Sequence, residues 1–316
     1  MQNPIEAINL TRTFGDLIAV DGISLAVSKG EVFGFLGPNG AGKSTAVRML
    51  TTLLKPTSGE AWVAGHNVVS NAGDVREKIG VALQDAAIDP LMTGNELLRL
   101  QSVLHGIPKR KARIRCGELL ERVGLTAAGD RRVGTYSGGM RRRLDLALSL
   151  VHEPEVLFLD EPTTGLDPTS RLALWEEVRN LNQEIGTTVF LTTQYLEEAD
   201  QLAQRIAIID EGKIVREGTP TMLKTQVGAP TLRVDVWDKD LRSAKEIMLQ
   251  FGDERPARKG RIAIGLNAGT RGITVVLKAL EDQSIEVQHV ELDEPSLDDV
   301  FADATGRRLE GGESTD

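Results

Sequence analysis

The nonapeptide GPNGAGKST, residues 37–45, is the most informative stretch of this 316-residue sequence. It matches the pattern G-x-x-x-x-G-K-[ST] and lies between an apolar run, EVFGFLG (31–37), and a helix-like run, KSTAVRMLTTLL (43–54). A buried strand, a glycine-rich turn and a helix, in this order, are the context in which the pattern binds phosphate. Glycines let successive backbone N–H groups point at one anion, and the helix N-terminus adds partial positive charge. The stretch therefore predicts a phosphate-binding loop.

This loop is expected to hold the phosphates of a nucleotide. The Lys43 side chain can reach the β- and γ-phosphates, and the Ser44 hydroxyl can ligate Mg²⁺. The alternative is a plain turn before a helix, which the full match in its strand-to-helix context disfavours. The residues predicted to bind nucleotide here are Gly37, Pro38, Asn39, Gly40, Ala41, Gly42, Lys43, Ser44 and Thr45.

A second apolar run, VLFLDE (156–161), ends in two acids. The run indicates a buried strand, so Asp160 and Glu161 fall at its carboxyl end, where α/β sheets bind ligands. We expect Asp160 to be a Mg²⁺ partner, through water, and Glu161 to polarise an attacking water. The alternative is a pair of solvated loop acids. Together with the loop, the two acids favour phosphoryl-transfer chemistry.

The composition limits the class of protein. Hydrophobic residues make up 41% of the chain, enough for a substantial core, and the net charge of -9 argues against a nucleic-acid partner. The single cysteine, Cys116, excludes an intramolecular disulfide framework. The start of the chain does not resemble a signal peptide, and no apolar run approaches the roughly 18 residues of a membrane span. Any role at a membrane would therefore need a separate membrane partner.

The fold class follows from the alternation of strand-like and helix-like runs over residues 1–225. Strands are expected at 31–37, 155–162 and 187–193, with a helix at 172–185. This alternation predicts an α/β domain with a parallel sheet. Residues 85–152 are mostly helix-like, as in an inserted helical subdomain.

A small α+β domain is expected over residues 231–305. The runs TLRVDVWD, RIAIGLN and SIEVQHVEL alternate apolar and polar residues like half-buried strands, with helix-like stretches between them. The linker is placed at residues 226–230, and residues 306–316 are expected to form a flexible tail.

The sequence resembles the ATP-binding subunit of an ABC transporter over roughly residues 5–225. Any one short motif could arise by chance, whereas several in the order of the family could not. The motifs are the loop GPNGAGKST, Gln84 in VALQD, YSGGM (136–140), VLFLDE (156–161), GLD (165–167), TTQYLEEAD (192–200) and Phe14 in RTFGDLIAV. The resemblance implies a P-loop NTPase fold that binds ATP and Mg²⁺.

Specific roles come with the resemblance. Gln84 lies at the Q-loop position, which implies a Mg²⁺ ligand and a link to the membrane subunit. Phe14 matches the aromatic residue that stacks on adenine, although a lone aromatic near an N-terminus is otherwise more often a core residue. Asp167, in the D-loop motif GLD, is implied to contribute to the nucleotide site.

Gln194 occupies the switch position, where the family usually has histidine. An amide can donate and accept hydrogen bonds but does not titrate near pH 7. Gln194 is therefore expected to act in catalysis by positioning and electrostatics, with Glu161 as the base.

The motif YSGGM, usually LSGGQ in the family, is expected to complete a second subunit's site. Ser137, Gly138 and Gly139 open a helix and would offer a hydroxyl, backbone N–H groups and a helix dipole to an anion. They cannot easily reach the phosphate loop of their own chain. The resemblance implies a head-to-tail homodimer, whereas a simple helix cap is the alternative. The neighbouring residues Arg141–Arg143 are expected to point outward, without a chemical role.

The end of the chain narrows the family. EPSLDDVFADATGR (294–307) resembles the end of ATP-binding subunits of the daunorubicin-resistance type, which drive drug or lipid export through a separate membrane subunit. The resemblance implies a peripheral protein on the cytoplasmic face of the cell membrane that hydrolyses ATP, with a permease handling a hydrophobic drug or lipid. Leu297, Val300 and Phe301 form an apolar stripe that suits either a docking helix or the closing helix of a small domain.

Other functions stay open at this point. Export of a cell-envelope lipid or polyketide is the alternative within the class. A soluble ABC ATPase that remodels ribosomes or DNA is disfavoured by the single phosphate loop and the lack of a long coiled-coil insertion. A nucleotide-gated regulator without turnover is disfavoured by Glu161 and favoured by the absence of the switch histidine.

Overall fold

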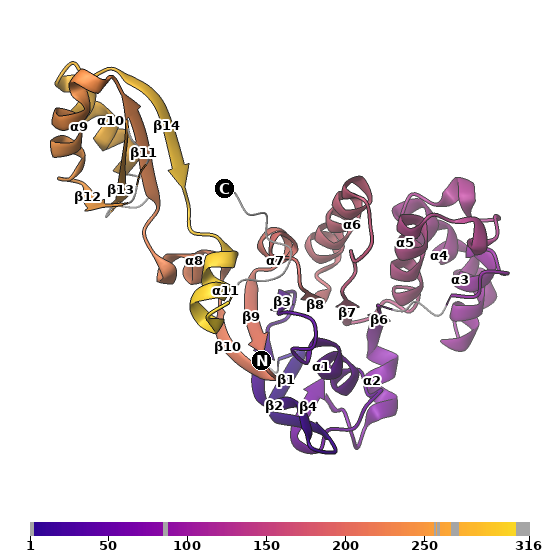
Figure 1. Ribbon diagram of the computed structural model, residues 1–316. Coiled ribbons are helices and arrows are strands. Elements are labelled where there is room, and N and C mark those ends of the chain that lie inside the picture. The colour runs from indigo at the N-terminus through magenta and orange to yellow at the C-terminus, as the bar shows by residue number, and fades with distance from the viewer. Residues whose placement is uncertain (1–2, 85–87, 256, 258–259, 267–271, 308–316) are drawn as a thin grey trace. The chain divides into compact units, whose positions relative to one another are not determined.

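The glycine-rich loop joins β3 (Val32–Leu36) to α1 (Lys43–Leu50) in the computed structural model. The structure describes residues 3–84, 88–255, 257, 260–266 and 272–307. The chain divides into two units, Met1–Pro220 and Thr221–Arg308. Figure 1 labels the elements of both.

The first unit contains both flanking elements of the loop and most of the remaining secondary structure. Its other elements are β1 (Ile5–Phe14), β2 (Leu17–Val27), β4 (Ser58–Val63), β5 (His66–Asn67), α2 (Ala72–Lys78), β6 (Ile79–Ala82), α3 (Gly94–Leu104), α4 (Lys109–Arg122), α5 (Gly138–Ser149), β7 (Val156–Asp160), α6 (Pro168–Asn180), a π-helical turn (Leu181–Ile185), β8 (Thr188–Thr193), α7 (Leu196–Leu202), β9 (Arg205–Asp210) and β10 (Lys213–Gly218).

A six-stranded sheet carries the loop, with the strand order β10-β9-β3-β8-β7-β6. The pairs around β3, β7 and β8 are parallel, as predicted, and these three strands are buried along their whole length. Strands covered on both faces read as continuous apolar runs, which explains why the sequence located them. On one face, the Phe190 ring packs against Phe33, Phe35 and Phe158 at centroid distances of 5.5–5.6 Å. The predicted α/β fold class is confirmed.

The carboxyl ends of three strands meet at one edge of this sheet. In the parallel register Leu36 of β3 lies beside Thr193 of β8, and Asp160 of β7 lies beside Thr192. The loop that follows β3 and the acids that end β7 are therefore neighbours, although more than a hundred residues separate them in sequence. This edge is where an α/β sheet binds its ligands.

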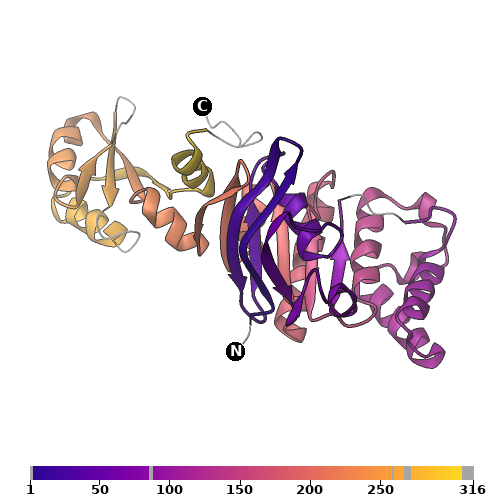
Figure 2. The ribbon, with the colours of Figure 1, turned by 90° about the horizontal axis from the view of Figure 1, so that it is seen from below.

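A second, antiparallel sheet covers the first unit on the side of α1, with the order β2-β1-β4-β5. It shares one hydrophobic core with β3 and α1, in which Ile5, Leu10 and Val47 are fully buried. Figure 2 shows the two sheets one behind the other. No pattern in the sequence predicted this sheet. The helix α1 also ends earlier than expected, because the Thr51 hydroxyl donates back to Val47 O (2.8 Å) and Thr52 turns to a φ of 65°.

The described residues between Gln84 and His152 form mostly helix. They contain α3, α4 and α5, which Figure 1 shows grouped together, and two short 3₁₀ turns, Thr126–Ala128 and Val133–Thr135. Residues 85–87, at the predicted start of the helical subdomain, lie outside the described residues.

The second unit is a two-layer α+β fold. Its elements are α8 (Pro220–Val227, whose first residue belongs to the first unit), β11 (Thr231–Val236), a 3₁₀ turn (Asp238–Asp240), α9 (Leu241–Met248), β12 (Gly252–Glu254), β13 (Arg261–Leu266), α10 (Gly272–Asp282), β14 (Val287–Asp293) and α11 (Leu297–Thr305). The antiparallel order β12-β13-β11-β14 with two crossover helices is the ferredoxin-like arrangement.

The limits of this unit bear on the predicted linker and on the last helix. The division between the units falls after the first residue of α8, whereas residues 226–230 begin within the last turn of this helix. The domain limits stay a prediction. On α11, Leu297, Val300 and Phe301 are 3%, 2% and 0% exposed. The apolar stripe is thus already buried in the folded chain, which removes the basis for the docking interpretation.

Candidate active site

The loop after β3 is shaped as a cradle that admits only glycine at key points. Gly42 has a φ of +104°, and a Cβ atom there would lie 2.3 Å from the carbonyl oxygen of Ala19. At Gly37, a Cβ atom would lie 2.3 Å from the carbonyl oxygen of Ile209. The loop therefore packs backbone against backbone, and α1 begins directly after it at Lys43. A helix N-terminus behind a glycine turn is a ready anion site.

A pocket of about 560 Å³ opens beside this loop. Of the predicted site residues, those that line it are Phe14, Asn39, Gly40, Gly42, Lys43, Ser44, Thr45, Gln84 and Glu161. Residues that line it but were not predicted are Leu17, Ile18, Ala19, Glu211 and Gly212. Phe14, Leu17 and Ile18 are 45%, 65% and 49% exposed and give one end of the pocket an apolar surface. The run RTFGDLIAV contains these three residues. The apolar residues after its glycine could therefore have been used to predict Leu17 and Ile18 as pocket residues.

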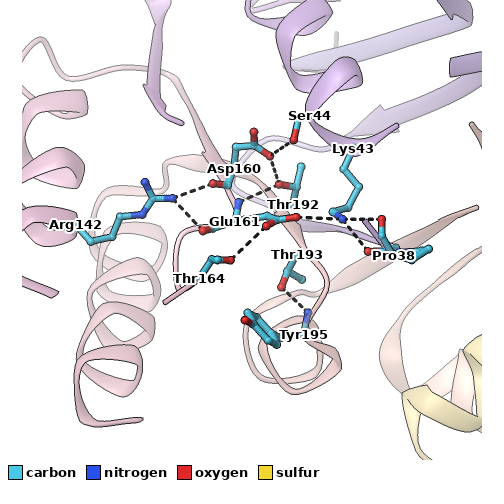
Figure 3. A network of polar contacts seen from close by, with 11 residues as sticks. Pro38, Lys43, Ser44, Arg142, Asp160, Glu161, Thr164, Thr192, Thr193 and Tyr195 are labelled. Carbon is cyan, nitrogen blue, oxygen red and sulfur yellow. Dashed lines mark hydrogen bonds and ion pairs between the residues drawn. The ribbon is translucent and has the colours of Figure 1, made fainter. Parts of the chain in front are cut away.

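Lys43 places a buried cation at the floor of the pocket. Its side chain is only 4% exposed, and Nζ donates to the carbonyl oxygens of Gly37 (2.8 Å) and Pro38 (3.0 Å). It also forms an ion pair with Glu161 Oε1 at 3.1 Å, and the Glu161 side chain is 5% exposed. A buried cation needs such partners, because desolvation without them is costly. Figure 3 shows these contacts converging from α1 and the end of β7.

Oxygen atoms from α1, β7 and β8 gather around the Asp160 carboxylate. Asp160 is 3% exposed, and its Oδ1 accepts hydrogen bonds from Ser44 Oγ (3.2 Å) and Thr192 Oγ1 (2.6 Å). Gln84, which follows β6, lines the pocket from another side. Hydroxyl, carboxylate and amide oxygens are the donors that Mg²⁺ prefers. The residues present therefore fit a magnesium ion.

Glu161 is held in a backbone conformation that non-glycine residues seldom adopt. Its φ is 48°, and its N–H donates to both Thr192 O and Thr192 Oγ1 at 3.1 Å. Its Oε2 accepts a hydrogen bond from Thr164 Oγ1 at 3.3 Å. Such a conformation costs free energy and persists where its surroundings hold it, often at functional sites. The chain turns here and directs the carboxylate into the pocket.

Arg142 corrects the expectation that Arg141–Arg143 all point outward. Arg141 is exposed, but the Arg142 side chain is 10% exposed and donates hydrogen bonds to the carbonyl oxygens of Asp160 (2.8 Å) and Glu161 (3.0 Å). It also contacts Asp145 Oδ2 at 3.4 Å, and burial raises the pKa of Asp145 to about 6. Arg143 donates to Val123 O (2.9 Å). Sequence reasoning missed Arg142 because nothing in a run of three arginines marks the middle one.

Ser137–Gly139, which we call the signature residues, and Asp167 of the D-loop lie at the starts of α5 and α6, and they do not line the pocket of their own chain. Ser137 Oγ caps α5 by accepting from the Met140 N–H (3.2 Å), and Gly138 has open space where a Cβ atom would be. At Gly139 a Cβ atom would lie 2.5 Å from Ser170 Oγ. Asp167 caps α6, and hydrogen bonds from Ser170 lower its pKa. Within one chain, Ser137 thus acts as a helix cap. A role of Ser137 in the site of a second chain stays a prediction.

Gln194 follows directly after β8 and is half-buried, but it does not line the pocket. The residues around it are tightly held. The Tyr195 N–H donates to Thr193 Oγ1 (2.9 Å), and the Trp175 indole N–H donates to Glu198 (2.9 Å) on α7. Burial raises the pKa of Glu198. The structure thus places Gln194 at the edge of the sheet that carries Glu161, while its catalytic role stays a prediction.

Comparison with known proteins extends these observations. Residues 20–164 match the family described as ABC transporter. The chain is 46% identical over 314 residues to the daunorubicin resistance ATP-binding protein DrrA2 of Streptomyces coeruleorubidus, covering 98% of this chain and 97% of that one. It is 37% identical over 309 residues to the Nod factor export ATP-binding protein I of Burkholderia thailandensis, with 97% and 98% covered.

A solved structure shows the same fold. The dimeric ATP-binding cassette MJ0796, bound to ADP and phosphate in a post-hydrolysis state, superposes with a TM-score of 0.62 at 26% identity. It covers 68% of this chain and 98% of its own. Within the described residues, no helix is both long enough and apolar enough to span a bilayer.

Proposed function

The chain belongs to the ABC transporter family as an ATP-binding subunit, and on that basis we propose that it hydrolyses MgATP to energise export of hydrophobic compounds through a separate membrane subunit. One observation carries the hydrolytic part of the proposal. The phosphate-loop lysine and the carboxylate that follows β7 form a buried ion pair in the pocket, with Asp160 and Ser44 in hydrogen-bond contact beside them.

The residues of the pocket have different roles in binding the adenine ring, the phosphates and Mg²⁺ and in accepting a proton. Phe14, with Leu17 and Ile18, offers an apolar surface for the adenine ring at the open end. The glycine cradle and Lys43 bind the phosphates, which compete with Glu161 for the ammonium group. Glu161, once released from Lys43, can accept a proton from water. Ser44, Asp160 and Gln84 would hold Mg²⁺, which supplies charge neutralisation on the phosphate oxygens.

Gln194 is proposed to orient the reacting groups without exchanging a proton. We expect Gln194→Ala to lower kcat about 10-fold or more, while the Kd for ATP stays within about twofold, because hydrogen bonds made only in the transition state act on kcat. Gln194→His keeps a donor and should remain active. Steady-state hydrolysis and equilibrium ATP binding measure the two quantities. Unchanged turnover in the alanine variant would show that the residue is a bystander.

The assembly proposed is a head-to-tail homodimer that docks on a permease at the cytoplasmic face of the membrane. Its support is that Ser137–Gly139 and Asp167 do not line the pocket of their own chain, and that the similar cassette MJ0796 is dimeric. In this arrangement each ATP is bound by the phosphate loop of one chain and the signature residues of the other. The membrane subunit then supplies the pathway and most of the substrate selectivity.

The exported compound is proposed to be a hydrophobic drug, as the name of the Streptomyces relative suggests. The alternative is a cell-envelope lipid or polyketide; the name of the Burkholderia relative, Nod factor export, shows that a similar chain serves export of a compound not named as a drug. Deleting the gene separates the two. Increased sensitivity to anthracycline-type compounds with an unchanged envelope lipid profile supports drug export, and the reverse result supports lipid export.

A further inference from the structure

Arg142 connects three segments of the chain. They are α5, on which it lies, the turn at the end of β7, and the residue before Gln84. Ser137 caps α5, and the guanidinium group of Arg142 donates to main-chain oxygens of the turn at the end of β7 and of the residue before Gln84. The acceptors are the carbonyl oxygens of Leu83 (2.5 Å), Asp160 (2.8 Å), Glu161 (3.0 Å) and Pro162 (2.8 Å). Figure 3 shows the contacts of Arg142 with Asp160 and Glu161. Leu83 immediately precedes Gln84, so one side chain connects α5 both to the backbone of Glu161 and to the residue before the Q-loop glutamine.

The chemistry of arginine suits this role. A guanidinium group is planar and always charged, and it presents several donors in a fixed fork. Here the guanidinium group donates to four neutral carbonyl oxygens, and it also contacts the Asp145 carboxylate. Three of the hydrogen bonds go to one turn of backbone, residues 160–162, and a buried cation bound in this way holds that turn in one geometry. The turn is the one at which Glu161 adopts its φ of 48°.

The neighbouring arginines show that the arrangement is specific to one position. Arg141 is exposed, and Arg143 donates instead to Val123 O at the end of α4. Gly139 packs so closely on Ser170 that α5 cannot slide past α6 at that point without disturbing the contact. Ser137 and Arg142 are five residues apart on one helix, about 7.5 Å along its axis. A displacement at the start of α5 is thus carried to the carbonyl oxygens of Asp160 and Glu161.

We propose that Arg142 is a positioning residue that couples the signature helix to Glu161, so that ATP bound at one site of the dimer sets the geometry for hydrolysis at the other. The inference rests on the proposed function, because it assumes that Ser137–Gly139 contact the ATP held by a second chain. The coupling needs no contact between Arg142 and nucleotide. Loss of the coupling should change turnover and cooperativity without changing the intrinsic affinity for ATP.

The test compares Arg142→Met with Arg143→Met, which removes a half-buried arginine from the same helix but leaves the β7 turn untouched. For Arg142→Met we expect kcat to fall about 100-fold, as a small misplacement of the base suffices for this. The Hill coefficient for ATP should fall from above 1 to about 1, and the Kd for ATP of the isolated chain should stay within about twofold. Arg143→Met should retain the wild-type Hill coefficient and most of its kcat.

A second variant protects the test against misfolding. Arg142→Lys keeps the charge but not the fork, so it should fold, lose the cooperativity and recover part of kcat. The proposal is overturned if the Arg142 variants match Arg143→Met in kcat and Hill coefficient, or if the wild-type Hill coefficient is about 1. A different result, absence of MgATP hydrolysis by the wild-type chain with its permease, overturns the proposed function itself.

Discussion

Glu161→Gln is expected to lower ATP turnover about 1000-fold while leaving ATP binding intact or tighter, because removing a general base costs rate and not affinity. The structure adds a reason for the tighter binding. In the structure the Glu161 carboxylate is itself the anionic partner of Lys43, at 3.1 Å. With glutamine at this position, the phosphates of ATP no longer compete with a carboxylate for that cation. The variant should therefore accumulate as an ATP-bound dimer.

Turnover, the Kd for ATP and the molar mass with and without MgATP measure this prediction. The matched control is Glu176→Gln, which makes the same change at an exposed residue of α6 and should behave like the wild type. A Glu161→Gln variant that stays monomeric and keeps full turnover would exclude Glu161 as the base.

Lys43→Ala is expected to affect both stability and ATP binding. The change leaves the Glu161 carboxylate buried without its cation, which should lower the free energy of unfolding by about 3–5 kcal/mol. It also removes the only cation that lines the pocket among the described residues, so ATP affinity should fall about 100-fold or more. Denaturant unfolding and equilibrium ATP binding measure the two effects.

Two further variants separate these effects. Lys78→Ala breaks an ion pair of similar length, 2.7 Å to Glu155, but both partners are about half exposed, so the free energy of unfolding should change little. In the double variant Lys43→Ala/Glu161→Gln no buried charge is left unpaired, so stability should largely return while ATP affinity does not. Wild-type ATP affinity in Lys43→Ala would show that the phosphate loop is wrongly assigned.

Local sequence patterns predicted the elements whose structure is determined by the residues of a single contiguous segment. The strand, loop and helix at residues 31–50 are contiguous, and β7 and β8 are buried on both faces, so their apolar runs are unambiguous. The outer sheet escaped prediction because β1 does not alternate regularly. Asn9 has a φ of 49°, and the pairing of β1 with β2 shifts register between Ala7 and Leu10, which interrupts the period of two.

In the site, too, the residues that lie in local motifs were predicted and those defined by contacts distant in sequence were not. Lys43, Ser44, Asp160 and Glu161 were predicted from motifs, and the structure brings these four together. Arg142 was not, because its carbonyl acceptors lie 18 to 59 residues away in sequence and any residue type can supply a carbonyl oxygen. The type of the partner residue therefore does not reveal a hydrogen bond to its main chain. Only the fold could show that α5 passes beside the end of β7.

The central claim is that each active site is shared between two chains, and a mixing experiment tests it directly. Lys43→Ala disables the phosphate loop, and Gly138→Asp places a carboxylate at the start of α5, where no atom lies within 4 Å of the added Cβ, so as to repel phosphate. Each variant alone should hydrolyse little ATP. A heterodimer of the two combines both lesions in one site and leaves the other site intact, so the mixture should turn over ATP above the sum of its parts. Its rate should stay below that of the wild type, because the disabled site no longer supplies the coupling through Arg142. Turnover equal to that sum would contradict the shared site.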